Sequence, residues 1–220
     1  MFGQAHRFFP GTVFVLVGVL GVSTSASADT INIFADMENS SEGLADFSGT
    51  LTYDFVLGDM GVLTVDLTNE IDPGFGGFLT AFIFNVGSED NDVTATLTST
   101  TNPFFLDAPD QNGGSFGNPF VGGAGLMGGF LGGGNRHNGL LPGESGTFTF
   151  DITASDAESL SAVDFILGGP LEFNFLARFR GVGDNGRSSD MVPGEVVPAP
   201  GVLVLLGIAA LAQRRRRRSA

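Results

Sequence analysis

Apolar and polar residues alternate with a period of two along much of the chain. In residues 50–57, Leu51, Tyr53, Phe55 and Leu57 take every second position, mostly between threonine and aspartate. The same alternation, or a short apolar run, marks six more segments: 31–34, 63–68, 82–86, 93–98, 147–152 and 173–180. Such a period is typical of half-buried antiparallel strands, with phenylalanine and leucine inside and threonine outside. The sequence therefore predicts about seven or more strands.

Turn-forming residues separate these segments. Gly58–Gly61 suits a hairpin, and Asp72-Pro73-Gly74 and Glu89–Asp92 interrupt the next two runs. Short strands with regular turns predict an all-β fold, an antiparallel β-sandwich. Ser155 and Glu158 have the spacing of a capping box ahead of Leu160, Val163 and Leu167, which predicts one short helix.

The segment 113–139 departs from this pattern, because 12 of its 27 residues are glycine. Ordering so many glycines is entropically costly, so the sequence predicts a long, mobile, Gly-rich loop. Five apolar residues are scattered through it: Phe116, Phe120, Leu126, Phe130 and Leu131. Two hypotheses follow: the loop is an inert insertion, or it covers the sandwich edge or contacts a partner.

The first 28 residues have the organisation of a cleavable secretion signal. Arg7 precedes the ten-residue apolar run 13–22, which is too short to span a bilayer of about 30 Å. Ala26-Ser27-Ala28 is a small-x-small cleavage site, and the first acidic residue follows it. We expect export through the secretion machinery, with cleavage after Ala28.

The last 23 residues, 198–220, form a second distinctive segment. Val197-Pro198-Ala199-Pro200 is held extended by its prolines and precedes a twelve-residue apolar run, 201–212. Five arginines, Arg214, Arg215, Arg216, Arg217 and Arg218, then keep the end of the chain on the cytoplasmic side. As a helix the apolar run rises only about 18 Å, so it predicts a short, temporary transmembrane anchor. A permanent anchor and a basic nucleic-acid-binding tail are the competing interpretations, and the second leaves the apolar run unexplained.

A short proline motif, the Leu205-Leu206-Gly207 segment and the terminal arginine cluster together resemble the PEP-CTERM sorting signal of Gram-negative bacteria. Ala199 stands where that family usually has glutamate. The resemblance covers the tail and implies an exosortase, a membrane-embedded protease, as a partner. It further implies transient anchoring in the inner membrane, followed by residence at the cell surface or in an exopolysaccharide matrix, as in a biofilm.

Charge and composition narrow the functions of the remaining body, residues 29–197. It contains all 24 acidic residues but only four arginines, a formal charge of 4 − 24 = −20. Such an acidic protein repels phosphates, so we expect no nucleic-acid partner. The chain has no cysteine, which excludes disulfides, thiol nucleophiles and zinc–thiolate sites.

Calcium is the one cofactor that the acidic clusters suggest. Glu89, Asp90 and Asp92 bring three carboxylates into one turn, but the twelve-residue calcium-loop pattern is absent. Two looser clusters are Asp107, Asp110 and Asn112, and Asp184, Asn185 and Asp190. Solvated turns are the competing interpretation of all three.

Few residues of the sequence indicate an enzyme. His137 is the sole histidine of the body and lies in the Gly-rich segment, without the nucleophile motif of a hydrolase. We therefore expect a non-enzymatic, structural or interaction protein. A polysaccharide-binding module, helped by calcium, is the alternative, although the chain has no Trp and one Tyr for stacking on sugars. A hydrolase built on paired carboxylates is the third hypothesis.

Overall fold

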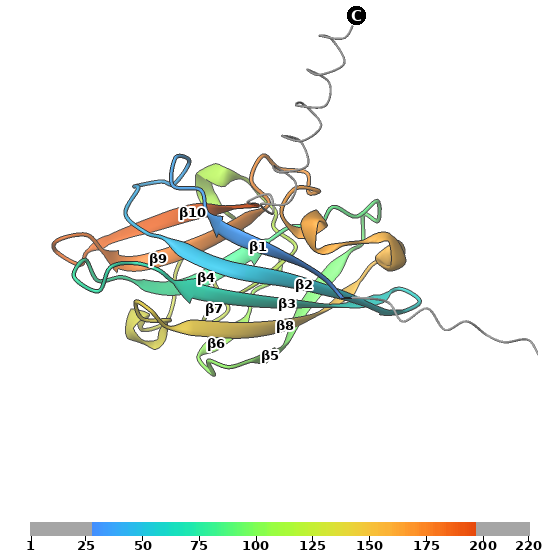
Figure 1. The fold of residues 1–220 in the computed structure, drawn as a ribbon, viewed down its shortest axis with the longest axis horizontal. Helices are drawn as coiled ribbons and strands as arrows, with labels where there is room; N and C mark the ends of the chain where they lie inside the picture. The colour runs from blue at the N-terminus through green and yellow to red at the C-terminus, as the bar shows by residue number, and fades with distance from the viewer. Residues whose placement is uncertain (1–27, 197–220) are drawn as a thin grey trace, which may run out of the picture.

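The computed structural model describes residues 28–196 and contains ten strands (Figure 1). Their bounds are β1 Asp29–Ala35, β2 Phe47–Leu57, β3 Met60–Asn69, β4 Phe78–Phe84, β5 Thr94–Thr100, β6 Phe105–Asp107, β7 Gly122–Leu126, β8 Ser145–Thr153, β9 Phe175–Val182 and β10 Ser188–Val196. Four short 3-10 turns complete the secondary structure: η1 Gly114–Phe116, η2 Arg136–Asn138, η3 Ala157–Ser159 and η4 Ala162–Phe165.

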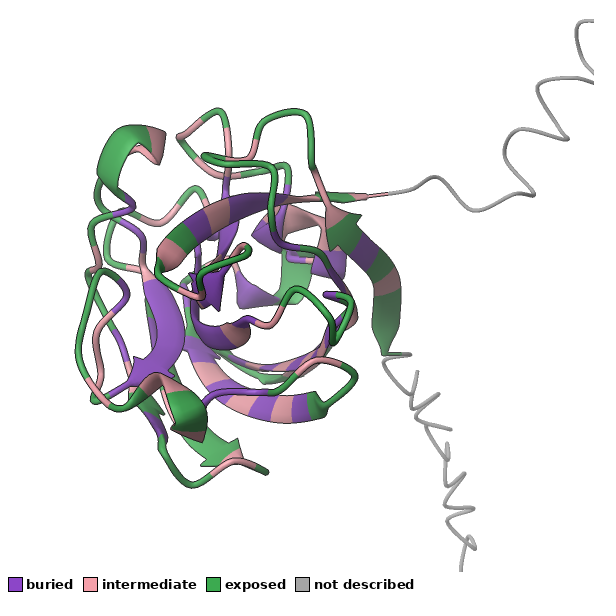
Figure 2. Cartoon of the chain, turned by 90° about the vertical axis from the view of Figure 1, so that its left-hand side faces the viewer, coloured by how far each residue is buried: buried purple, intermediate pink, exposed green. Residues whose placement is uncertain are grey.

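The strands form one antiparallel succession in the order β5-β8-β3-β2-β1-β10-β9-β4-β7-β6. It folds into two five-stranded layers that are joined where β1 pairs with β10. At the opposite side β5 approaches β6, and the Leu97 N–H donates to the Asp107 carboxylate at 2.8 Å. Figure 2 shows the strands curving round a shared centre. The predicted all-β antiparallel fold is confirmed.

Phenylalanine fills the space between the layers. Phe82 of β4 packs edge-on against Phe148 of β8, with ring centroids 4.8 Å apart, and Phe84 meets Phe150 at 5.0 Å. All four rings are completely buried. Aromatic side chains bury large apolar areas, so this stack supplies the core that a chain without disulfides needs.

Each of the seven predicted segments overlaps a strand, but β6, β7 and β10 were missed. β10 contains Pro193 and Gly194, which argue against a strand in sequence. It pairs with β9 up to Pro193 and with β1 from Gly194 onward, so it changes layer at that point. Because Pro193 sits at the corner, its missing N–H interrupts neither ladder.

The prediction of a loop throughout 113–139 was wrong. Residues 122–126 form β7, which is entirely buried between β4 and β6, and Phe120 and Phe130 are also buried. A Cβ on Gly123 would lie 2.3 Å from the Phe82 carbonyl oxygen, and one on Gly122 would lie 2.6 Å from the Ala95 Cβ. Glycine is required there because neighbouring backbone and the facing layer approach too closely for a side chain.

The predicted helix after Ser155 was also wrong. The region forms only the two turns η3 and η4. The capping box lies at Ser161 and Asp164 instead. The Asp164 carboxylate accepts from the Ser161 N–H at 2.8 Å and from the Ser161 hydroxyl at 2.7 Å. Among residues 28–196 no helix is long and apolar enough to cross a membrane. The predicted anchor at 201–212 lies outside these residues.

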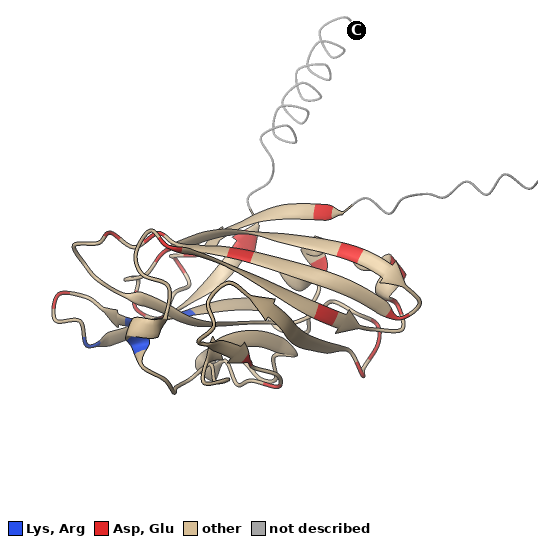
Figure 3. Cartoon of the chain, turned by 90° about the horizontal axis from the view of Figure 1, so that it is seen from below, with Lys and Arg blue, Asp and Glu red and all other residues tan. Residues whose placement is uncertain are grey.

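Arginines fasten the glycine-rich segment to the sandwich, at one end of the molecule (Figure 3). Arg178 donates to the Phe130 carbonyl at 2.6 Å, and Arg180 donates to the Gly133 carbonyl at 2.7 Å. Arg136 donates to the Gly186 carbonyl. Burial lowers the pKa of Arg178, and the neighbouring Arg180 lowers it further. Three of the four cations of the body therefore bind main-chain carbonyls of the loops.

Candidate functional site

Most residues of the predicted sorting and processing sites fall outside the described part of the chain. These are Ala26, Val197, Pro198, Ala199, Pro200, Arg214, Arg215, Arg216, Arg217 and Arg218. Ala28 is described: it is exposed and immediately precedes β1. The last described residue, Val196, is the final residue of β10.

The predicted calcium ligands do not converge. Asp90 accepts from the Asp92 N–H at 2.9 Å and from the Ser155 N–H at 2.7 Å, and the two bonds lower its pKa. The Glu89 N–H donates to the Asp156 carboxylate at 2.8 Å. The pKa of Asp156 is lowered, chiefly by the hydrogen bond from the Ser88 hydroxyl. Within residues 28–196 no group of three or more His, Asp or Glu side chains is arranged to hold a metal ion. The carboxylates fasten the 88–92 turn to the start of the η3 region.

The two looser acidic clusters also have roles in the fold. Asp107 bonds to β5, as described above, and Asn112 accepts from the Gly114 N–H at 2.7 Å. Asp190, interpreted as part of a solvated turn, is completely buried in β10. That interpretation was wrong, since its carboxylate accepts hydrogen bonds from the loop 41–45.

His137 is exposed, as expected, but it lies in an ordered turn. The Asn135 side chain accepts from the His137 N–H at 3.2 Å and caps η2. The imidazole packs edge-on against Phe78, with ring centroids 4.7 Å apart. No carboxylate of the described residues bonds to the ring, so the geometry of a nucleophile–base–acid triad is not formed there.

An open groove of about 460 Å³ begins beside His137. Two loops line it, 101–104 between β5 and β6 and 137–145 between η2 and β8. We call it the Phe104 groove. Phe104 is 53% exposed and Leu141 44% exposed, so the lining offers apolar surface to solvent. Polar side chains complete the lining: Thr101, Asn102, His137, Asn138, Glu144 and Ser145.

Asn102 holds the two loops together. Its side-chain amide donates to the Asn138 carbonyl at 3.0 Å, and its Oδ1 accepts from the Phe104 N–H at 3.1 Å. The second bond forms a tight Asx turn, which directs Phe104 outward while Phe105 enters the core. Phe104 lies outside the alternating segments for which the sequence predicts core phenylalanines.

The floor and far wall of the groove are equally fixed. Leu140 is buried and exchanges two backbone hydrogen bonds with Leu79, at 3.0 and 3.1 Å. The Glu144 Oε2 accepts from the Leu141 N–H at 2.9 Å. Within the described residues no hydrogen bond engages the Asn138 amide group, the His137 ring or the Glu144 Oε1.

Sequence reasoning missed this site because its two loops are more than 30 residues apart and match no motif. One signal was available. The run Asn102-Pro103-Phe104-Phe105 breaks the period of two, so one of its adjacent aromatic rings cannot share the core face.

Comparisons with known proteins find similarity only among solved structures. Biomass-sensing modules of Rsgi-like proteins of Clostridium thermocellum, described as resembling the family 3 carbohydrate-binding module of the cellulosome, share 10% identity with the chain. That match covers 74% of this chain and 99% of the module, with a TM-score of 0.31. The module of the Rsgi2 protein from the same organism shares 9% identity over 80% of this chain and all of its own, with a TM-score of 0.28. No protein-family model and no curated protein matches the chain. Values this low transfer no ligand to this chain.

Proposed function

We propose that the chain is an exported, non-catalytic structural protein of the cell envelope or extracellular matrix, processed by an exosortase-type sorting system. The observation that supports this function is that all ten strands of the described residues lie between the two predicted cleavage sites. β1 starts at Asp29, directly after the predicted signal cleavage site, and β10 ends at Val196, directly before the proline motif. Both cuts would leave all ten strands intact.

The start of the processed body is fastened to the fold. The Asp29 carboxylate accepts from the Ala162 N–H of η4 at 2.9 Å, and Asp29 to Phe34 pair with β2. A mature chain beginning at Asp29 would keep these interactions, because none of them involves the removed residues.

At the other end, the predicted anchor would hold the body close to the membrane during processing. Val196 pairs with Ile33 in the sheet, and only residues 197–200 separate it from the apolar run. Four extended residues reach about 14 Å. The protease would meet its site beside the β1–β10 junction, and release from the tail would free the acidic body from the membrane.

Replacing Arg214 to Arg218 by glutamine in the full chain tests the role of the tail. Without the arginines nothing holds the apolar run against the cytoplasmic face, so we expect the variant to keep its tail while the unaltered protein loses it. Arg187→Gln, an exposed arginine of the body, is the matched control and should be processed normally. Mass spectrometry of the exported chains reads out the tail. Equal processing of all three proteins would contradict the proposal.

A further inference from the structure

We propose that the Phe104 groove binds one pyranose unit of a neutral polysaccharide. The next units of the polysaccharide contact the adjoining outer face of β1, β2, β3 and β8, which is rich in threonine. This inference is independent of how the protein is sorted. The first step is the Phe104 ring, which is 53% exposed although the neighbouring Phe105 is fully buried. An aromatic ring presented to solvent by a tight turn offers a flat apolar surface, on which the C–H face of a sugar ring can stack.

The second step is the set of polar groups around that ring. The Asn138 amide both donates and accepts, the His137 imidazole offers two ring nitrogens, and the Glu144 Oε1 accepts. Sugar hydroxyls are simultaneously donors and acceptors, so this mixture suits adjacent hydroxyls of a pyranose. A small number of polar groups around apolar surface is typical of small-ligand sites.

The walls and the floor of the Phe104 groove are held rigidly. The Asn102–Asn138 hydrogen bond joins the two walls, and the Leu79–Leu140 bridge fixes the floor to β4. A site that is already ordered loses little conformational entropy on binding. Stacking on Phe104 is weak, but on an ordered loop it can still contribute to binding, because little of its energy is offset by ordering the loop.

The fourth step is the surface into which the groove opens. Ser145 lines the groove and also pairs with Thr68, their hydroxyl oxygens being 2.8 Å apart. Thr68 belongs to the outer face of β1, β2, β3 and β8, where Thr30, Thr52, Thr64 and Thr149 align across successive strands. Sheet geometry spaces such hydroxyls about 4.8 Å across strands and about 6.7 Å along them. A polysaccharide leaving the groove would meet further hydrogen-bonding groups.

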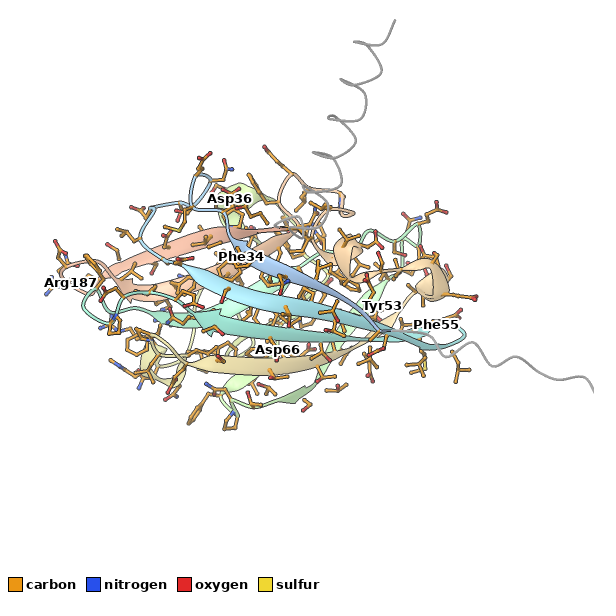
Figure 4. All side chains as sticks on the ribbon, in the orientation of Figure 1. Phe34, Asp36, Tyr53, Phe55, Asp66 and Arg187 are labelled. Carbon is orange, nitrogen blue, oxygen red and sulfur yellow. The ribbon has the colours of Figure 1, made fainter. Side chains whose placement is uncertain are left out.

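The negative charge of this outer face favours neutral polysaccharides over anionic ones. Asp66, labelled on β3 in Figure 4, lies in this face and accepts from Thr50 at 3.3 Å and from Thr147. Glu144 adds a carboxylate within the groove. Together with the net charge of −20 on the body, these carboxylates repel uronic acids and other anionic sugars. Neutral hexose or N-acetylhexosamine polymers are the ligands that fit.

NMR of the full chain carrying His6→Gln tests the proposal, because His137 is then the only histidine, whatever the processing. Cellohexaose, chitohexaose and mannohexaose serve as neutral probes, and trigalacturonate as an anionic one. We expect at least one neutral hexamer to shift the His137 ring signals, and to bind more tightly than its monosaccharide. Trigalacturonate should leave the signals in place.

Phe104→Ala should weaken binding of that hexamer about tenfold, the loss expected for one stacking contact. Phe75→Ala is the matched control, since Phe75 is 58% exposed in the β3–β4 turn, outside the groove. Asn138→Ala is a second groove variant that removes no apolar surface, and the melting temperature of each variant reports folding.

Three results would overturn the proposal. In the first, no neutral hexamer shifts the His137 signals; in the second, both folded groove variants bind as well as the Phe75 control. In the third, the signals shift with protein concentration alone, which would assign the groove to a second copy of the chain.

Discussion

The Asp190 carboxylate organises the connection between β1 and β2. Its Oδ1 accepts from the Ser41 hydroxyl and the Glu42 N–H, both at 2.9 Å. Its Oδ2 accepts from the Leu44 N–H at 2.7 Å and the Ala45 N–H at 3.0 Å. A buried carboxylate is tolerated because these four donors replace the hydration that it loses.

Asp190→Asn should therefore destabilise the fold by about 3 kcal/mol, because the new amide NH₂ faces N–H groups that need an acceptor. Urea unfolding measures the change. Asp184→Asn, an exposed aspartate in the β9–β10 turn, is the control and should change the free energy of unfolding by less than about 0.5 kcal/mol. Equal stabilities of the two variants would show that the carboxylate has no special role.

Tyr53, the only tyrosine, lies in the second half of β2, two residues before Phe55 (Figure 4). Burial raises its pKa to about 12, with a smaller contribution from Asp156, and its hydroxyl donates to the Ala157 carbonyl at 2.8 Å. An acid whose pKa is raised by folding stabilises the fold fully below the unfolded pKa of 10.0. That contribution is lost as the pH rises from 10 toward 12.

Phenolate absorbance of the folded protein should therefore reach its midpoint near pH 12, and near pH 10 in denaturant. In Tyr53→Phe the free energy of unfolding should lose its dependence on pH in this window, apart from what other groups contribute. Ionisation near pH 10 in a protein that is still folded by circular dichroism would be inconsistent with the buried phenol.

At the scale of elements, β7 shows how a strand can be built from glycine. Its sequence GGAGL has no alternation and low strand propensity. Pairing with β4 and β6 and contact with the facing layer order it instead. Such tertiary effects are invisible to period and propensity, so this strand could not be predicted from sequence, whereas β2, β3 and β8 could.

Gly123→Ala should destabilise the fold by at least about 2 kcal/mol, because the added Cβ meets the Phe82 carbonyl and the Ile83 Cα. Gly132→Ala is the matched control in the same segment, where the Cβ has nothing within 4 Å. It should change the free energy of unfolding little, or raise it slightly by restricting the unfolded chain. Thermal unfolding of the two variants distinguishes an ordered strand from a mobile insertion. In a mobile insertion both substitutions would change the free energy of unfolding equally little.

At the scale of the molecule, the sequence predicts the class of fold more fully than the site. Alternation and turns were sufficient to predict the antiparallel sandwich. The Phe104 groove depends on two distant loops that Asn102 brings together, and the role of Asp190 depends on a contact about 145 residues away in sequence. Contacts of this kind carry no local pattern.

The intact mass of the protein recovered from the cell surface and medium shows whether both ends of the chain are removed. We expect a chain that begins at Asp29 and ends near Val197 and that retains all ten strands. A full-length chain that is soluble inside the cell, with residues 1–28 and 198–220 still attached, would contradict it.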